Sequence, residues 1–228
     1  MRIEFTHKFG LQEQADVQYY KANLVDVQPN EYDDALAQGW SLSFENGKLT
    51  WFQSRSTRCN LNEIDYVLFN DAHYKVGDYN KKKAELRHIY SAYCYYKKYQ
   101  DLFHDEVETW LDTDMLFEYY DDAEFVGWSK LRRYSNKSLE TVLFAWDYAK
   151  PDLKLGHNSL YHELAWAKLA GYEYVYMGPG YELSGLYKAN IQGFEWWTGS
   201  EWSVDNQEYK RACRRDAKLS SFSGLGDL

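Results

Sequence analysis

The stretch YVYMGPGYELSGLYKANIQGFEWW, residues 174–197, decides how the fold is assigned. An apolar, β-branched and aromatic run at 172–178 predicts a strand. The run stops at Gly178-Pro179-Gly180, because glycine and proline are the strongest breakers of regular structure. Tyr187 and Lys188 follow in a short helical segment. The stretch therefore predicts a strand that ends abruptly, with a tyrosine and a lysine placed just beyond its end.

The segments around this stretch predict a sheet with one helical crossover. A strand pair comes before it, a helix leads into it, and further short strands follow it. In chain order the predicted elements are strands 124–134 and 139–149, a turn at 150–158, a helix at 159–170, a strand at 172–178, a short helix at 182–191, and strands at 193–199 and 201–205. This order predicts an α/β (mixed α+β) fold with a mixed, mostly antiparallel sheet flanked by helices.

The N-terminal part, residues 1–75, predicts a small α/β region, and residues 76–228 predict a larger second domain. Asn46-Gly47 is the strongest short signal for a β-hairpin. The predicted elements of this half are a helix at 29–40, strands at 40–45, 48–54 and 64–70, and a helical region at 80–120. The helical region carries one apolar stripe at helical spacing, formed by Leu86, Ile89, Tyr90, Tyr93 and Tyr96.

Composition excludes some classes of function. The chain has 228 residues and a net charge of −9, whereas a protein that adheres generally to nucleic acid is basic. A nucleic-acid partner must therefore dock on a local patch. Neither a run of about 20 apolar residues nor a signal-like start occurs, so we expect a soluble, cytoplasmic protein without a membrane partner. Cys59, Cys94 and Cys213 are few, odd in number and far apart, which predicts neither a disulfide framework nor a metal site.

The residues that end the 172–178 strand are the first candidates for a binding site. Gly178 and Gly180 let a substrate approach the backbone closely, and N–H and C=O groups at such a strand end can bind an extended acyl or peptide group. The alternative is an ordinary tight turn, because glycine and proline dominate turns. A local run of tyrosines favours a pocket: Tyr174, Tyr176, Tyr181 and Tyr187.

Tyr187 and Lys188 are the sharpest chemical candidates. A tyrosine beyond a strand edge can donate a proton to a leaving group, and a lysine can neutralise a phosphate or a carboxylate. The alternative for Tyr187 is that its ring packs between sheet and helix. His162, in the predicted helix, could act as a general base, and the alternative is a surface or core histidine.

Anion binding is a further prediction for the start of the 159–170 helix. Gly156, His157 and Asn158 lie there, and backbone N–H groups at a helix start bind anions. The alternative is that Asn158 or Ser159 serves only as an N-cap. Basic clusters are the places where an RNA could land, and each is also consistent with a solvated face. These clusters are Lys81–Lys83 with Arg87, Lys97-Lys98, Arg132-Arg133, and Lys210-Arg211 with Arg214-Arg215.

Two pairs of segments carry a resemblance to a known family. LGHNSLYHELAWAKLAGYEYVYMGPGY (155–181) and YKANIQGFEWWTGSEW (187–202) resemble the C-terminal half of arginyl- and leucyl-tRNA–protein transferases. These enzymes have a Leu-Gly turn, a helix, a G-x-x-Y-x-Y-x-G segment and then a Tyr-Lys pair. PNEYDDALAQGW (29–40) and WFQSRSTRC (51–59) resemble the N-terminal region of the same family. The order of elements also resembles the GNAT acyltransferase fold.

The resemblance implies an aminoacyltransferase that moves an amino acid, arginine or leucine, from an aminoacyl-tRNA onto the amine of a protein, peptide or small molecule. It implies Tyr187 as the general acid with Lys188 as its catalytic neighbour. It also implies aminoacyl-tRNA as co-substrate and no cofactor. The residues expected to bind substrate are Arg55, Arg58, Gly156, His157, Asn158, Tyr176, Gly178, Gly180, Tyr181, Glu182 and Trp196.

The sequence departs from related enzymes at two places. The family's N-terminal cysteine cluster is absent, since only Cys59 stands in that region, and we therefore expect no metal or iron–sulfur centre. The turn at 153–158 does not fit the Arg/Gln-x-x-Gly-x-Gly/Ala turn of GNAT enzymes that use coenzyme A, which favours tRNA as the donor. Two alternatives stay open: an acyl-CoA-dependent GNAT N-acyltransferase that uses acetyl-CoA, and a catalytically inactive binding protein of the same fold.

Overall fold

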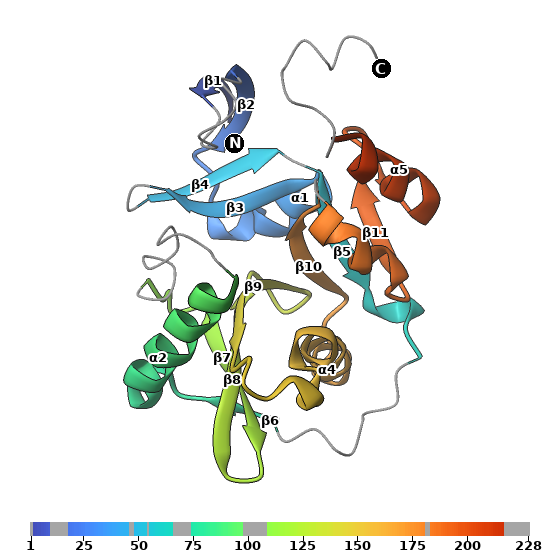
Figure 1. Ribbon diagram of the computed structural model, residues 1–228. Helices are drawn as coiled ribbons and strands as arrows, with labels where there is room; N and C mark the ends of the chain where they lie inside the picture. The colour runs from blue at the N-terminus through green and yellow to red at the C-terminus, as the bar shows by residue number, and fades with distance from the viewer. Residues whose placement is uncertain are drawn as a thin grey trace. The chain divides into compact units, whose positions relative to one another are not determined.

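The computed structural model describes residues 2–9, 18–45, 48–53, 55–65, 74–97, 109–180 and 183–216 (Figure 1). The chain forms two compact units. The first contains Met1–Asn60 together with Met177–Leu228, and the second contains Leu61–Tyr176. Strand β10 (Tyr174–Pro179) runs through the boundary between them. The compact units therefore divide the chain differently from the predicted regions 1–75 and 76–228.

The second unit is built on a mixed, mostly antiparallel sheet, as the sequence predicts. Its strands follow the order β10, β9, β8, β7, β6, and only the β9–β10 pair is parallel among the described strands of this unit. The predicted hairpin is confirmed, because two of the strands pair antiparallel at the expected place. The strands are β6 (Tyr74–Gly77), β7 (Asp114–Asp121), β8 (Glu124–Arg133) and β9 (Ser138–Trp146).

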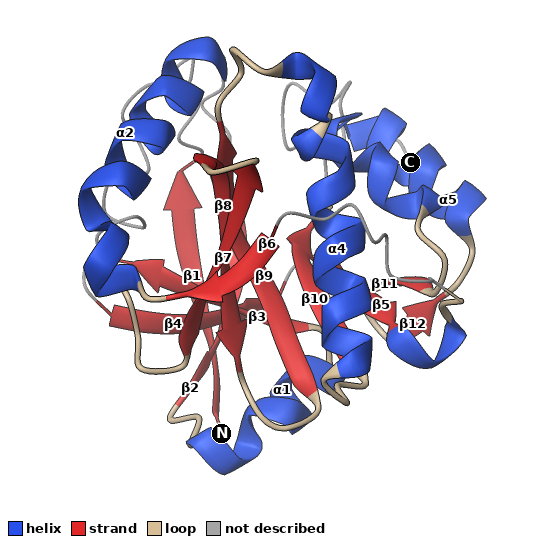
Figure 2. Cartoon of the chain, turned by 90° about the horizontal axis from the view of Figure 1, so that it is seen from below, coloured by secondary structure: helices blue, strands red, loops and turns tan. Residues whose placement is uncertain are grey.

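Helices α2 (Tyr79–Lys97) and α4 (Leu155–Leu169) cover opposite faces of this sheet (Figure 2). The indole N–H of Trp128 donates a hydrogen bond of 3.2 Å to the carbonyl of Leu86 in α2. The hydroxyl of the next residue, Ser129, donates to the carboxyl group of Glu163 in α4. Because successive side chains of a strand point to opposite faces, the two helices lie on opposite sides of β8.

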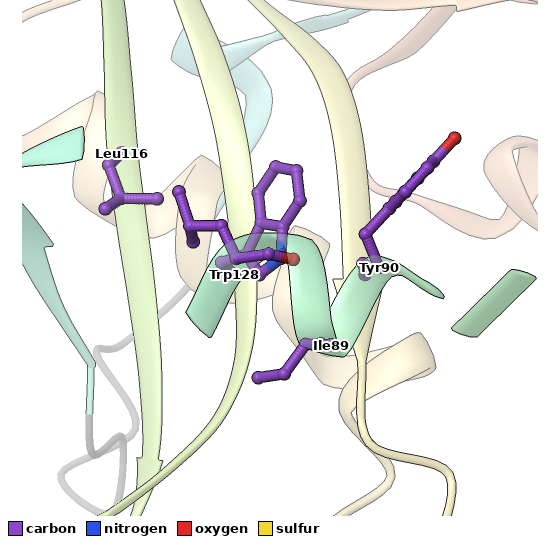
Figure 3. Packing of buried hydrophobic residues seen from close by; sticks show 6 residues of the cluster. Ile89, Tyr90, Leu116 and Trp128 are labelled. Carbon is purple, nitrogen blue, oxygen red and sulfur yellow. The ribbon is translucent and has the colours of Figure 1, made fainter. Parts of the chain in front are cut away.

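Trp128 is the centre of the core between α2 and the sheet (Figure 3). It is fully buried, as are Leu86 on the helix and Leu116 on β7. Ile89 and Tyr90 continue the same helix face into this cluster, so the predicted apolar stripe of α2 is confirmed in its first half. Tyr96, predicted on the same stripe, is 55% exposed, because the packed face of the helix ends before it.

The predicted helical region 80–120 is wrong at its end. Residues 98–108 lie outside the described part of the chain, and Asp114–Asp121 forms strand β7. Leu116–Tyr119 is buried on both faces of the sheet, so this strand does not show the alternation that marks a half-buried one. A short buried stretch without this alternation cannot be distinguished from a helix by periodicity.

The start of α4 also differs from the prediction. The helix begins at Leu155 rather than at Ser159, after a short 3₁₀ turn at Pro151–Leu153. Lys154 precedes it in the left-handed backbone region, with φ of 51°. Gly156 and Asn158 consequently lie inside the first helical turn instead of in a loop before it.

The first unit contains a four-stranded antiparallel sheet among its described residues, in the order β1, β2, β4, β3. The predicted hairpin of residues 40–54 is confirmed by the β3–β4 pairs, while Asn46-Gly47 lies outside the described residues. The helix predicted at 29–40 is shorter and consists of a 3₁₀ turn, η1 (Pro29–Glu31), and α1 (Tyr32–Ala37). The strands are β1 (Arg2–Phe9), β2 (Gln18–Val25), β3 (Trp40–Glu45) and β4 (Lys48–Gln53).

The same unit contains the strands that surround the end of β10. Strand β5 (Ser56–Asn60) pairs antiparallel with β11 (Phe194–Trp197), and β11 pairs with β12 (Trp202–Ser203). The 3₁₀ helix η4 (Leu183–Asn190) and helix α5 (Asn206–Asp216) complete this region. A 3₁₀ turn, η2 (Leu61–Glu63), begins the second unit, and the strand predicted at 64–70 falls mostly on residues outside the described ranges. None of the helices in the described ranges is long and apolar enough to cross a membrane.

Candidate active site

The two glycines at the end of β10 are each explained by the backbone or by a neighbour. Gly178 has φ of 70°, a left-handed conformation that glycine adopts without the strain of a side chain. Gly180 lies against helix α5, where a Cβ atom would be 2.0 Å from the hydroxyl oxygen of Tyr209. The glycines therefore do more than form a turn: the first redirects the chain, and the second lets α5 approach it.

Side chains of the first unit hold the carbonyl groups at this strand end. The hydroxyl of Thr57 donates to the Gly178 carbonyl at 2.7 Å. The ammonium group of Lys188 donates to the carbonyls of Met177 and Pro179, at 2.5 and 3.1 Å. The sequence predicts N–H and C=O groups ready for a ligand here, whereas these three carbonyls already accept hydrogen bonds. The strand end is therefore held by side chains of the protein itself.

Tyr187 and Lys188 are consecutive residues of η4 with very different surroundings. Lys188 is only 8% exposed and reaches inward to the β10 carbonyls. Tyr187 is 50% exposed. Lys188 thus holds the strand end through hydrogen bonds, and the adjacent Tyr187 lies at the surface.

Helix α5 supplies two residues that sequence reasoning missed. Tyr209 is fully buried, and its hydroxyl donates to the Gly185 carbonyl at 3.2 Å. The Cys213 thiol donates to the Gly180 carbonyl at 3.3 Å. Burial, and secondarily the neighbouring Cys213, raises the pKa of Tyr209 far above its ordinary value, so this hydroxyl keeps its proton. Tyr209, Ala212 and Cys213 stand at helical spacing, and that apolar stripe was the signal available in the sequence.

Arg55 and Trp196 border the same strand end. The backbone carbonyl of Arg55 accepts a hydrogen bond from the Gly180 N–H at 2.9 Å. Its guanidinium carbon lies 6.0 Å from the ring centre of Trp196, and its charge partly offsets the raised pKa of Tyr209. Trp196 is buried and its ring centre lies 5.9 Å from that of Tyr209. Of the predicted residues, the structure gathers these at one place: Arg55, Gly178, Gly180, Tyr187, Lys188 and Trp196.

Arg58, predicted to bind substrate, is engaged within the protein. Its Nε atom lies 2.6 Å from a carboxylate oxygen of Glu195, and both side chains are almost buried. Its guanidinium carbon also lies 4.0 Å from the ring centre of Trp202. An arginine that is paired and stacked in this way braces the β5–β11–β12 strands.

The remaining predicted residues belong to the second unit or lie outside the described chain. Asn158 is not an N-cap, since its own N–H donates to the carbonyl of Lys154 at 3.0 Å within the helix. Gly156 is exposed in the first turn of α4. His157 follows it in that turn, and its side chain lies outside the described part of the structure. Tyr176 is buried in β10. Tyr181 and Glu182 lie outside the described residues.

The second unit holds a buried carboxyl group that the sequence did not single out for chemistry. Glu163 accepts hydrogen bonds from the hydroxyls of Tyr119, at 2.7 Å, and Ser129. Burial raises the pKa of Glu163 to about 7, against the opposing effect of these two donors. Its neighbour His162 lies 5.5 Å from the ring centre of Tyr74, and burial lowers the pKa of that histidine. His162 is therefore a half-buried histidine packed beside Tyr74.

A pocket of about 360 Å³ lies in the second unit, outside the set of predicted site residues. Its lining comes from β6, from the end of β7 and from the following turn. The lining residues are Tyr74, Lys75, Tyr120, Asp122 and Ala123. Lys75 is engaged there with the buried carboxylate of Glu118, at 3.4 Å.

Comparison with known proteins finds likeness only among solved structures. No protein-family model matches the chain. No curated protein sequence matches it either. The similar structures include the C-terminal domain of a protein assigned as a lysylphosphatidylglycerol synthetase, from Agrobacterium fabrum. That pair has 10% identity and a TM-score of 0.44, and the alignment covers 69% of this chain and 54% of that one.

Two further solved structures are similar at the same level. L-PGS from Bacillus licheniformis has 13% identity and a TM-score of 0.41, with 79% of this chain and 62% of that chain covered. A GCN5-related N-acetyltransferase from Kribbella flavida has 10% identity and a TM-score of 0.39, with 70% and 58% covered. The chain thus spans between half and two thirds of the length of these three proteins. Its own fold class is the one that the sequence predicts: mixed α+β, with mostly antiparallel sheets and flanking helices.

Proposed function

We propose that the protein is an acyltransferase that takes an aminoacyl group from an aminoacyl-tRNA and transfers it to an amine of a protein, peptide or small molecule. The observation that carries the proposal is the arrangement around the end of β10. Lys188 and Thr57 fix the carbonyls of this strand end, and Tyr187 stands half-exposed on the same turn as Lys188. These residues come from the segments that resemble the tRNA–protein transferases.

The reaction makes modest demands on such a site. The amine nitrogen attacks the ester carbonyl carbon, a C–N bond forms, and the bond from that carbon to the 3′-oxygen of the RNA breaks. The ester is already activated, so the enzyme has mainly to position the amine and to stabilise the leaving oxygen. The leaving 3′-oxygen takes up one proton, and the attacking amine loses one.

Tyr187 is the residue proposed to deliver that proton. Its hydroxyl donates to the leaving 3′-oxygen, and the proton released by the amine restores it. Among the residues gathered at the strand end, Tyr187 combines a hydroxyl group with substantial exposure. Tyr209, by contrast, is buried, and its hydroxyl donates a hydrogen bond to the Gly185 carbonyl. The proposal therefore assigns the acid role to Tyr187 and a structural role to Tyr209.

Lys188 acts in this proposal as a positioning residue. Its ammonium holds two carbonyls of β10, and its backbone carries Tyr187 on the adjacent position. The loss of this brace would change where the strand end and Tyr187 lie relative to a bound ester. The amino acid transferred is arginine or leucine in this proposal, by the sequence resemblance alone.

The test is an assay of amino-acid transfer from each aminoacyl-tRNA. Purified protein is mixed with a full set of radiolabelled aminoacyl-tRNAs and a cell lysate, and acid-stable label is counted separately on protein and on small molecules. Label from one amino acid supports the proposal and names the donor. If no charged tRNA gives label while acetyl-CoA raises the melting temperature, the protein uses acyl-CoA instead, because a ligand selective for the native state stabilises it.

A further inference from the structure

The outer face of helix α5 carries exposed positive charge. Arg211, Arg214 and Arg215 are exposed and stand at positions i, i+3 and i+4, so they are neighbours on one face of the helix. We call them the arginine face of α5. The opposite face, with Tyr209 and Cys213, is fully buried. The helix as a whole has four cationic residues against Glu208 and Asp216, in a chain whose net charge is −9.

The buried face of α5 rests directly on the end of β10. The Cys213 thiol donates to the Gly180 carbonyl, and the Tyr209 hydroxyl fills the space beside Gly180 and donates to Gly185. An α-helix with its side chains is about 10–12 Å across. The arginine face therefore lies roughly one helix diameter, about 10 Å, from the strand end where the proposed function places the ester.

The arginine face differs from several cations of the other predicted basic clusters, which form ion pairs within the protein. Lys81 and Lys82 of α2 pair with Asp78 and Glu85, at 3.4 and 3.5 Å. Arg132 is buried and its Nε atom lies 2.8 Å from Asp114. By contrast, neither Arg211 nor Arg214 forms an ion pair in the part of the chain that the structure describes.

Helix stability does not account for the whole face. Cations in the last turn of a helix interact favourably with its macrodipole, and Arg214 and Arg215 stand in that turn. The effect falls off beyond the last turn, and Arg211 lies before it. Arg211 is exposed, forms no ion pair among the described residues and lies beyond the reach of the helix dipole, which points to an anionic partner.

We propose that the arginine face of α5 binds backbone phosphates next to the aminoacylated 3′ end of the tRNA. This inference rests on the proposed function and names how its RNA substrate is held. The ester is at the RNA's 3′ terminus, so the last phosphates must lie near whatever residues receive the ester. Guanidinium groups bind phosphate oxygens in a bidentate manner and do not distinguish bases, so the face accepts different tRNA sequences.

The test is the salt dependence of tRNA binding by the double variant Arg211→Ala/Arg214→Ala. Binding of fluorescently labelled, deacylated tRNA is measured by anisotropy between 50 and 200 mM salt. Each phosphate contact to single-stranded nucleic acid contributes about 0.7 to the slope of log K against log salt, so the slope should fall by about 1.4. Affinity at 100 mM salt should fall roughly 25-fold by the same relation.

Matched variants separate this surface from a general charge effect. Lys83→Ala/Arg87→Ala removes the same charge from the basic cluster of α2, the competing surface for RNA, and on this inference its slope and affinity equal those of the wild type. Arg211→Lys/Arg214→Lys keeps the charge, and its slope should stay near the wild-type value. A wild-type slope in the alanine double variant, or an equal loss in the α2 control, overturns the inference.

Transfer measured in parallel keeps the two proposals apart. If wild-type protein transfers an amino acid from tRNA and the alanine double variant does so with unchanged KM, the function stands and this surface is wrong. If wild-type protein binds tRNA through α5 and transfers nothing, the surface stands and the proposed function is wrong. Thermal melting of each variant shows whether it is folded, and exposed Arg→Ala changes in a helix should leave the melting temperature nearly unchanged.

Discussion

The hydroxyl oxygen of Tyr209 occupies the space in which a side chain at position 180 would begin. A Cβ atom on Gly180 would lie 2.0 Å from this oxygen and 3.0 Å from the Thr57 methyl group. Since Tyr209 is fully buried and donates to Gly185, it has little room to withdraw. Glycine is thus required at position 180 because helix α5 packs directly against the chain after β10.

Gly180→Ala should destabilise the protein by about 1–3 kcal/mol, because the added methyl group overpacks the contact between residue 180 and Tyr209 of α5. Urea unfolding measures the change. Gly156→Ala is the matched control: an added Cβ there meets its nearest neighbour, Trp146, at an ordinary 3.5 Å, and alanine favours a helix, so stability should rise or stay unchanged. Combining Gly180→Ala with Tyr209→Phe should recover part of the loss, and strictly additive effects would show that the two residues do not interact.

Lys188→Met should lower both stability and turnover. The carbonyls of Met177 and Pro179 lose a buried donor, which costs about 1–3 kcal/mol. In a transfer assay kcat should fall while KM for the charged tRNA stays within about twofold, since the residue positions the site and does not hold the RNA. Lys83→Met, an exposed lysine of α2, is the control and should change neither quantity. An increase of KM at unchanged kcat would instead assign Lys188 to substrate binding.

Tyr187→Phe should lower kcat by about 100-fold, because it removes the proposed general acid, and it should change the melting temperature little, because the ring is half-exposed. Tyr95→Phe is the matched control, since Tyr95 is an 82% exposed tyrosine of α2. Full activity in Tyr187→Phe would mean that the ring of Tyr187 has a packing role only.

Glu163 should make stability fall as pH rises toward neutrality. Its pKa in the folded protein, about 7, is above the value of about 4.3 in an unfolded chain, so the folded state binds the extra proton between these values. Stability therefore decreases from about pH 4.5 to 7 and then levels off, by a total on the order of 3 kcal/mol.

Glu163→Gln isolates this effect, because glutamine keeps the shape and cannot ionise. Urea unfolding at pH 5, 6, 7 and 8 should show a smaller decline with pH for the variant than for the wild type. The carbonyl oxygen of the introduced glutamine would still accept hydrogen bonds from Tyr119 and Ser129. Parallel pH curves for the two proteins would show that Glu163 is ionised throughout this range.

The sequence predicts the region from residue 124 onward well, because its strands are separated by clear turn residues. The hairpin of β8 and β9, helix α4 and strands β10 and β11 all lie where they are expected, although α4 starts four residues early. The early start depends on Lys154, whose left-handed conformation is unusual for a lysine and has no sequence signal. The prediction of strand β7 is wrong for a different reason: residues 116–119, which include the buried Glu118, are buried on both faces of the sheet and show no alternation of apolar and polar residues.

The candidate site could be predicted only in part. Glycines and the Tyr-Lys pair identify the end of β10, because these residue types have local meaning. The partners that fix the geometry come from distant parts of the chain: Thr57 reaches Gly178 across 121 residues, and Cys213 reaches Gly180 across 33. The sequence also could not show whether Lys188 binds a ligand or, as the structure shows, the backbone carbonyls of β10. Such choices depend on tertiary contacts and not on local pattern.

The division of the chain inside β10 also sets an order of events at the ribosome. Leu61–Tyr176 is one continuous stretch, so the second unit can close while the rest of the chain is still being made. The first unit combines two separate stretches of the chain and must wait for Met177 and the residues that follow it. Until then Ser56–Asn60 has no β11 to pair with, and this unpaired strand edge is exposed to association with other chains.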